Sequence, residues 1–172
     1  MSVTDIIDSY FSGEKLESAW IVLAGALALA AALALWLVAR EPFAKGLAAT
    51  LLLTATLGLI VGGTVYLRTD AQVAALHELE ATDPDRFSAT EGARIATVVK
   101  SFGHYRLAYA VATLLALVCV FLVGRPVFHG LAVGLLILAA LGYTIDFFAE
   151  ERARTYQRGL ADAGAIPAPA ES

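Results

Sequence analysis

Long apolar runs without a charged residue dominate the hydrophobic pattern of this chain. Four of them, residues 18–39, 46–67, 107–124 and 126–145, contain no Asp, Glu, Lys or Arg. A helix needs about 20 apolar residues to cross a bilayer core of about 30 Å, and it satisfies its own backbone groups there. The pattern predicts an all-α polytopic membrane protein. Its four transmembrane helices, about 18–39, 46–67, 107–124 and 126–148, are expected to form an up-down bundle.

The polar segment between the second and third runs also has a helical pattern. Apolar residues recur at helical spacing in residues 73–79 and again in 95–102, where they lead into the third run. Pro84 separates the two stripes, and the Ser-Ala-Thr-Glu sequence at 88–91 is typical of a capping box that opens a helix. Residues 68–106 are therefore expected to form a cytosolic antiparallel hairpin that extends helices two and three.

The remaining polar residues define the ends of the domain and its orientation. Nine of the twelve Lys and Arg residues lie on the side that holds both termini and the hairpin, which predicts that this side is cytosolic. We expect residues 1–160 to form one transmembrane domain with both termini in the cytosol. Residues 161–172, rich in Ala and Pro, are expected to form a flexible tail.

Composition narrows the class of protein further. Hydrophobic residues make up 59% of the 172 residues and charged residues 16%, whereas a soluble domain has about 25% charged residues. The net charge of −4 gives no basic footprint for nucleic acid. A soluble enzyme, a disordered chain and a nucleic-acid-binding protein are therefore not expected, and the first partner is the lipid bilayer.

Few residues of the kinds that hold cofactors or metals are present. The one cysteine, Cys119, lies in an apolar run, where a thiol behaves as a small hydrophobe. His77, His104 and His129 fall at different depths of the predicted bundle, so a haem held between two imidazoles is not expected. No nucleophile, phosphate-binding or metal motif is evident. We expect no cofactor, no metal and no catalytic residue.

Asp146 is the one acidic residue predicted inside a span. An intramembrane acid is by default a candidate functional residue, and Asp146 is expected several ångström inside the cytosolic edge. It has two interpretations: a proton or cation relay partnered with Arg106 or Arg68, or an interfacial carboxylate paired with one of these arginines. Arg152 follows shortly after it on the same helix and completes the set of candidate ion-pairing residues.

Small residues four apart mark candidate contacts between helices. They occur at Gly58 and Gly62 and again at Gly130 and Gly134, where missing side chains let two backbones approach closely. Such faces serve either packing inside one bundle or association between copies. The pattern favours packing inside the bundle.

The two halves of the chain resemble each other. The offset in numbering that pairs Gly46 with Gly130 also pairs Gly58 with Gly142 and Arg68 with Arg152. We call this constant separation the repeat offset. The turns before these segments align after deletion of one residue. A duplication would relate two hairpins by an axis along the membrane normal. The alternative is that spans rich in Leu, Ala and Gly match through composition alone.

Three segments carry a family resemblance. They are Phe43-Ala-Lys-Gly46, the hairpin at 68–106, and the sequence DFFAEERARTY at 146–156. Together they resemble an uncharacterised family of small four-span bacterial inner-membrane proteins, over most of residues 1–160. The resemblance implies the topology and no catalytic residue.

The predicted function is that of a non-enzymatic membrane scaffold. Apolar spans joined to a charged hairpin with an apolar stripe favour docking of a membrane or cytosolic protein, or of another copy, through residues 68–106. The alternative is a small ion or proton channel or transporter subunit that uses Asp146 and the interfacial arginines. A lipid-handling enzyme is a third hypothesis, for which the sequence offers no nucleophile.

Overall fold

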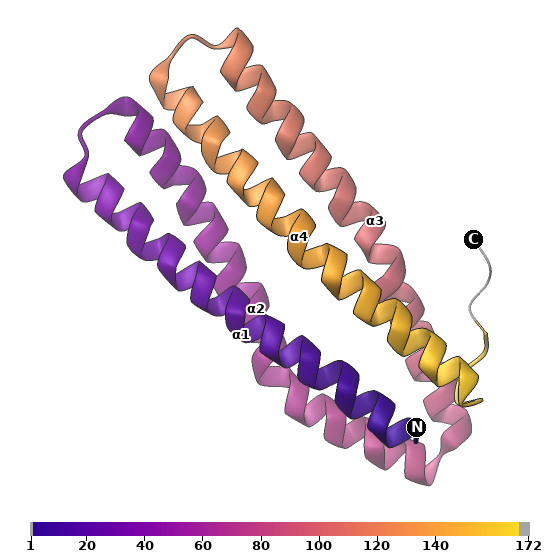
Figure 1. Ribbon diagram of the computed structural model, residues 1–172. Coiled ribbons are helices and arrows are strands. Elements are labelled where there is room, and N and C mark those ends of the chain that lie inside the picture. Colours follow the sequence, from indigo (N-terminus) through magenta and orange to yellow (C-terminus); the bar gives the residue numbers. More distant parts are fainter. Residues whose placement is uncertain (1, 169–172) are drawn as a thin grey trace.

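Four long helices make up the protein in a computed structural model that describes residues 2–168 (Figure 1). Both described ends of the chain and the turn at Asp83 lie at one end of the molecule, and the turns at 39–41 and 123–125 lie at the other. Each helix has a window long and apolar enough to cross a membrane. The predicted all-α fold with four apolar helices is therefore confirmed. The helices are α1 (Val3–Val38), α2 (Pro42–Thr82), α3 (Pro84–Leu122) and α4 (Pro126–Asp162).

Local sequence explains where the helices begin. Pro42, Pro84 and Pro126 occupy the first turns of α2, α3 and α4, where a missing N–H costs nothing. Ser2 and Asp5 form a capping box at the start of α1. The prediction that a helix starts at the 88–91 capping box was wrong, because the Asp83 carboxylate already caps the helix by accepting from the N–H of Arg86 at 3.1 Å.

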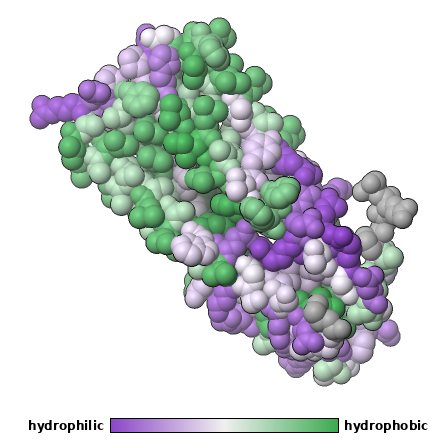
Figure 2. All heavy atoms as spheres, viewed as in Figure 1, coloured by the Kyte–Doolittle hydropathy of each residue, from purple (hydrophilic) through white to green (hydrophobic). Residues whose placement is uncertain are grey.

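The apolar half of the molecule has its large side chains on the outside. Trp20, Leu37 and Phe121 are 63%, 79% and 77% exposed, and hydrophobic residues cover this half in Figure 2. Small residues such as Ala32, Ala55 and Ala139 are buried between the helices instead. This arrangement suits lipid, which solvates large apolar side chains as well as a protein core does, so that helices associate through close packing.

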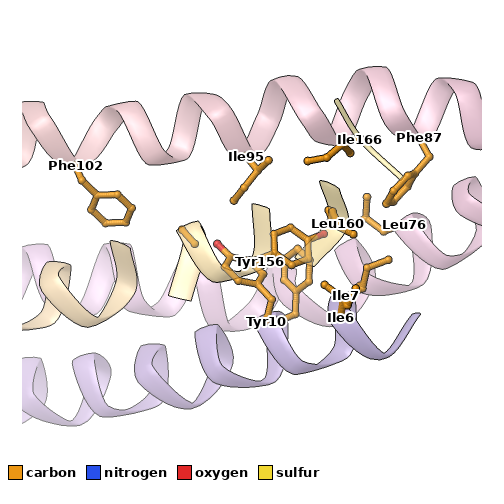
Figure 3. Close-up of a cluster of buried hydrophobic side chains, with 12 residues drawn as sticks. Ile6, Ile7, Tyr10, Leu76, Phe87, Ile95, Phe102, Tyr156, Leu160 and Ile166 are labelled. Carbon is orange, nitrogen blue, oxygen red and sulfur yellow. The ribbon is translucent and has the colours of Figure 1, made fainter. Parts of the chain in front are cut away.

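The polar half has an opposite organisation, with large side chains in a core shared by all four helices (Figure 3). The apolar stripes of 73–79 and 95–102 lie inside this core. The predicted hairpin of residues 68–106 is not confirmed, because α2 packs mainly against α1 and α4, and α3 packs mainly against α4. The sequence reasoning missed the first turns of α1 as the covering element. The core residues are Ile6, Ile7, Tyr10, Phe11, Leu76, Phe87, Ile95, Phe102, Ala153, Tyr156, Leu160 and Ile166.

Burial recurs along the chain at the repeat offset. The bounds of the hairpins follow the same offset, since α1 ends at Val38 and α3 at Leu122, while α2 begins at Pro42 and α4 at Pro126. The register is therefore continuous and needs no deletion at the turn. Buried pairs at this offset are Ile7 and Glu91, Phe11 and Ile95, Ser18 and Phe102, Ala32 and Ala116, Gly46 and Gly130, Ala48 and Ala132, Thr50 and Gly134, Ala55 and Ala139, Thr69 and Ala153, and Leu76 and Leu160.

The two hairpins meet through reciprocal glycines on α2 and α4. A Cβ on Gly46 would lie under 3.0 Å from the carbonyl of Val127, and a Cβ on Gly130 under 3.0 Å from the carbonyl of Phe43. Phe43 and Val127 are themselves separated by the repeat offset. Gly46 therefore contacts Val127, and its counterpart Gly130 contacts Phe43, the counterpart of Val127. The contact obeys the same internal repeat as the burial.

All four predicted packing glycines lie at contacts between helices of this chain. Gly58 and Gly62 face α1, where their nearest atoms include the carbonyls of Ile21 and Ser18, while Gly130 and Gly134 face α2. The sequence reasoning did not single out Gly25, the glycine of α1 that Gly58 meets.

Residues 161–168 are more ordered than a tail beginning at residue 161 implies. Helix α4 continues to Asp162, and Gly164 then reverses the chain with a φ of +72°, a conformation that favours glycine. Ile166 returns to the core and is 6% exposed. The remaining part of the predicted tail, 169–172, lies outside the described residues.

Replacing the reciprocal glycines is expected to separate the hairpins. Gly46→Ala or Gly130→Ala places a methyl group against a backbone carbonyl, which cannot rotate away, and overpacking of this kind costs about 1–3 kcal/mol. Gly63→Ala on α2 is the matched control, since a Cβ there meets nothing within 4 Å. Thermal unfolding in detergent measures both. Equal midpoints for the three variants would contradict a backbone contact.

Candidate functional site

A buried ion pair lies in the core of the polar half. The Glu91 side chain is 1% exposed, and Arg94 donates to both of its oxygens, from Nε at 2.7 Å and from Nη2 at 2.6 Å. Tyr156 on α4 donates its hydroxyl to Glu91 Oε1 at 2.7 Å. The carboxylate therefore has three donors from two helices, as a buried charge requires.

Aromatic rings from α1 cover the cation of this pair. The Arg94 guanidinium lies 5.9 Å from the ring centre of Tyr10 and 5.3 Å from that of Phe11, within cation–π range. Tyr10 and Tyr156 stack at 4.3 Å, as Figure 3 shows. Burial raises the pKa of Tyr10 to about 12, and burial together with the Glu91 charge raises the pKa of Tyr156. Both phenols therefore stay protonated, and Tyr156 remains the donor to Glu91.

A second ionic layer lies closer to the apolar half. Arg152 donates to Glu17, and Arg68 lies 3.8 Å from Glu14. Glu14 Oε2 and Arg152 Nε are buried without a hydrogen-bond partner among the described residues. Burial raises the pKa of Glu14, and the charges of Arg68, Arg94 and Arg152 only partly offset the effect. Arg68, a predicted partner of Asp146, and Arg152, another candidate ion-pairing residue, are thus engaged with α1.

Asp146 has a different partner from the one predicted. Tyr109 on α3 donates its hydroxyl to Asp146 Oδ2 at 2.8 Å. Arg106 instead donates to Glu150 Oε2 at 2.6 Å. The expected pairing of Asp146 with an arginine is therefore not formed, because Glu150, one helical turn beyond Asp146, takes the Arg106 guanidinium.

The Tyr109–Asp146 pair departs from the internal repeat. Its counterparts at the repeat offset are Gly25 and Gly62, both of which are buried where α1 packs against α2. In the second hairpin a Cβ on Gly142 would meet the Tyr109 ring. The second hairpin thus has a hydrogen-bonded polar pair where the first has close contact between helices.

Two hollows adjoin this part of the second hairpin. One, of about 450 Å³, is lined by Arg106, Tyr143, Thr144, Asp146, Phe147, Phe148 and Glu150. The other, of about 670 Å³, runs along the polar part of α3 past Ala89, Ala96 and Lys100 to Arg106, with Arg154 on its far wall. Arg106 lines both. The hollows give this region a binding surface that includes two arginines and two carboxylates.

The described histidines and carboxylates are not grouped as a metal or haem site requires. No cluster of three His, Cys, Asp or Glu side chains suited to a metal occurs within residues 2–168. His77 lies 3.0 Å from Asp8 near the polar end, while His129 lies on the first turns of α4 at the opposite end.

Scans of protein-family models, curated proteins and solved structures found no match to this chain. The fold defines the class, an all-helical protein whose four apolar helices are compatible with multiple membrane crossings.

Removing one partner of the buried ion pair is expected to be costly. Glu91→Ala leaves the Arg94 guanidinium, which is 25% exposed, without its partner; breaking a fully buried pair costs about 3–5 kcal/mol, so the loss is expected at the lower end of that range. Glu78→Ala removes an exposed glutamate from α2 and is the control. Thermal unfolding in detergent compares them. Exposed surface ion pairs contribute below about 1 kcal/mol to stability. A loss of stability in that range for Glu91→Ala would contradict a buried pair.

Glu14 is expected to make stability rise as the pH falls. Its folded-state pKa is raised, so protonation favours the folded state, and the gain is lost as the pH rises through the folded pKa. Glu14→Gln should reduce the dependence of stability on pH at pH values just above the ordinary pKa of glutamate, whereas Glu78→Gln should leave this dependence unchanged. Unfolding midpoints between about pH 5 and 8 test this, and an unchanged slope in Glu14→Gln would contradict it.

Proposed function

We propose that the protein is a non-enzymatic scaffold of a bacterial inner membrane. In this proposal the helices cross the bilayer up and down, and the polar bundle and both termini lie in the cytosol. The charge asymmetry of the sequence supports the orientation, and the exposed large side chains of the apolar half support lipid contact. The polar bundle has its own core, so it can present a rigid surface.

The outer face of α3 is the docking surface in this proposal. The apolar stripes at 73–79 and 95–102 pack in the internal core and cannot bind a partner. On the opposite side of α3, Ala89, Ala93, Ala96 and Gly103 are exposed. Their spacing of seven, three or four residues places them on one helical face, where an exposed helix outside a membrane ordinarily carries charge.

The same face continues into the apolar half. It passes through Leu107, Leu114 and Phe121, which are 65%, 62% and 77% exposed. Over its whole length α3 packs mainly against α4, whereas α2 packs against both α1 and α4. An open face that continues from the water-exposed half into the lipid-exposed half fits a partner helix that is itself a membrane span with a cytosolic extension.

The occupant we propose is a helix of another membrane protein. Lys100 lies near the middle of the face and is exposed, and in a symmetric pair it would meet its own copy. A partner with an acidic residue at that level avoids the repulsion. The single observation that carries the proposal is the line of exposed small residues of α3 that line the 670 Å³ groove.

The channel alternative rests on Asp146. The structure places this residue in a hydrogen bond with Tyr109 beside a hollow, while the interior of the apolar half is packed by Ala and Gly through backbone contacts. These contacts favour a dry bundle, so we propose docking in preference to conduction.

Protection of the α3 face in native membranes tests the proposal. In a Cys119→Ala background, Ala93→Cys should react slowly with a maleimide in broken membranes and quickly after purification, because purification removes the partner. Ala75→Cys, exposed on α2, should react quickly in both. Equal rates for Ala93→Cys before and after purification would overturn the proposal. A cross-link of twice the chain mass would assign the face to a second copy.

A further inference from the structure

The hollow beside Asp146 lies where the apolar surface of α4 gives way to charge. Phe147 and Phe148 are 68% and 62% exposed on one side of it, and Glu150 and Arg154 follow within two turns. On α3 the change falls at Arg106, directly before the apolar run that begins at Leu107. Both helices therefore pass through the headgroup layer at this hollow when the apolar half is in lipid.

Glu150 holds two arginines from different helices side by side. It accepts from Arg106 Nη1 at 2.6 Å through one oxygen, and from Arg154 Nε and Nη2 at 3.0 and 2.8 Å through the other. The carboxylate is 13% exposed, whereas the arginines are 52% and 45% exposed. Because each guanidinium has five N–H donors, both have donors left to face outwards.

The charge around this arrangement is positive. Lys100, Arg106 and Arg154 line the larger groove, whereas two carboxylates, Glu150 and Asp146, line the smaller hollow. A fixed pair of guanidinium groups matches the geometry of a phosphate, which accepts two parallel N–H bonds from each fork. The smaller hollow then adds apolar walls, Phe147 and Phe148, on the lipid side of the same arginine.

The fold does not need this arrangement. At the repeat offset, the counterparts of Arg106, Glu150 and Arg154 are Val22, Tyr66 and Asp70. The first hairpin packs its helices without any of the three charges, and its Asp70 pairs with Lys15 at 2.6 Å. The arginine pair is therefore specific to the second hairpin, which distinguishes it from the charges that any helix carries at a membrane surface.

We propose that this hollow, together with the adjoining end of the larger groove that Arg154 lines, binds the headgroup of an anionic phospholipid with one phosphate and free hydroxyls. Arg106 and Arg154 hold the phosphate, and the acyl chains lie against Phe147 and Phe148. Asp146, with its Oδ2 bound to Tyr109, accepts a headgroup hydroxyl and repels a second phosphate. The site adjoins the proposed docking face at the larger groove, but Arg106 projects from another side of α3 than Leu107, since successive residues of a helix are turned by about 100°.

Lipid retention measures the proposal directly. The full-length protein is purified in detergent and mixed with equal amounts of phosphatidylglycerol and phosphatidylcholine, and bound lipid is counted by native mass spectrometry. We expect about a tenfold preference for phosphatidylglycerol. Arg106→Gln combined with Arg154→Gln should abolish the preference. Arg40→Gln combined with Arg86→Gln, which removes two arginines elsewhere, should keep it.

Further arms separate folding and free phosphate from the proposed site. Elution volume and helicity in detergent establish that the double variant is folded, and Arg106→Lys, which keeps the charge but loses the fork, should reduce the preference partly. Competition by glycerol phosphate as effective as by phosphatidylglycerol would reassign the site to a soluble phosphate and overturn the lipid proposal. Equal retention of both lipids by the native protein would overturn it as well.

Discussion

The contact between the backbones of α2 and α4 is the constraint on which the rest of the structure depends. Gly46 and Gly130 let the two helices approach until each backbone touches the other, and this brings the two hairpins together at the end far from the polar core. The approach leaves no room for large side chains between the inner helices, so these point outwards. It also leaves α1 and α3 at the edges of the apolar half, where α3 keeps one open face. The open face of α3, to which we assign docking, is thus a consequence of where the glycines lie.

The polar half obeys a different constraint, since burial there is driven by water. Large residues such as Phe11, Phe87 and Leu160 are almost fully buried, and such side chains each contribute about 1.5–3 kcal/mol when removed from water. The buried pair of Glu91 and Arg94 costs desolvation that its hydrogen bonds and aromatic neighbours offset. Two adjacent halves of the same helices therefore use opposite rules: small residues inside against lipid, and large residues inside against water.

The four apolar helices could be predicted because charge-free runs of about 20 residues have one structural solution in lipid. The arrangement of the polar half could not, because the stripe at 95–102 is equally consistent with a hairpin partner and with a core shared by four helices. The first turns of α1 were missed for the same reason: Ile6, Ile7, Tyr10 and Phe11 lie outside the predicted span. Glu91 was interpreted as a capping residue, although its counterpart in the repeat is the buried Ile7, which is the signal that could have placed it in the core.

The internal repeat also shows which features the fold does not require. Where both halves share a residue type, as at Ala55 and Ala139, packing explains the residue. Where they differ, the first half serves as an internal control. Gly25 and Gly62 pack α1 against α2, whereas Tyr109 and Asp146 form a hydrogen bond at the edge of a hollow. Close packing was available at these positions, as the first hairpin demonstrates. A polar pair that replaces it near a membrane surface gives up helix contact and gains hydrogen-bonding groups, which points to a ligand of the second hairpin.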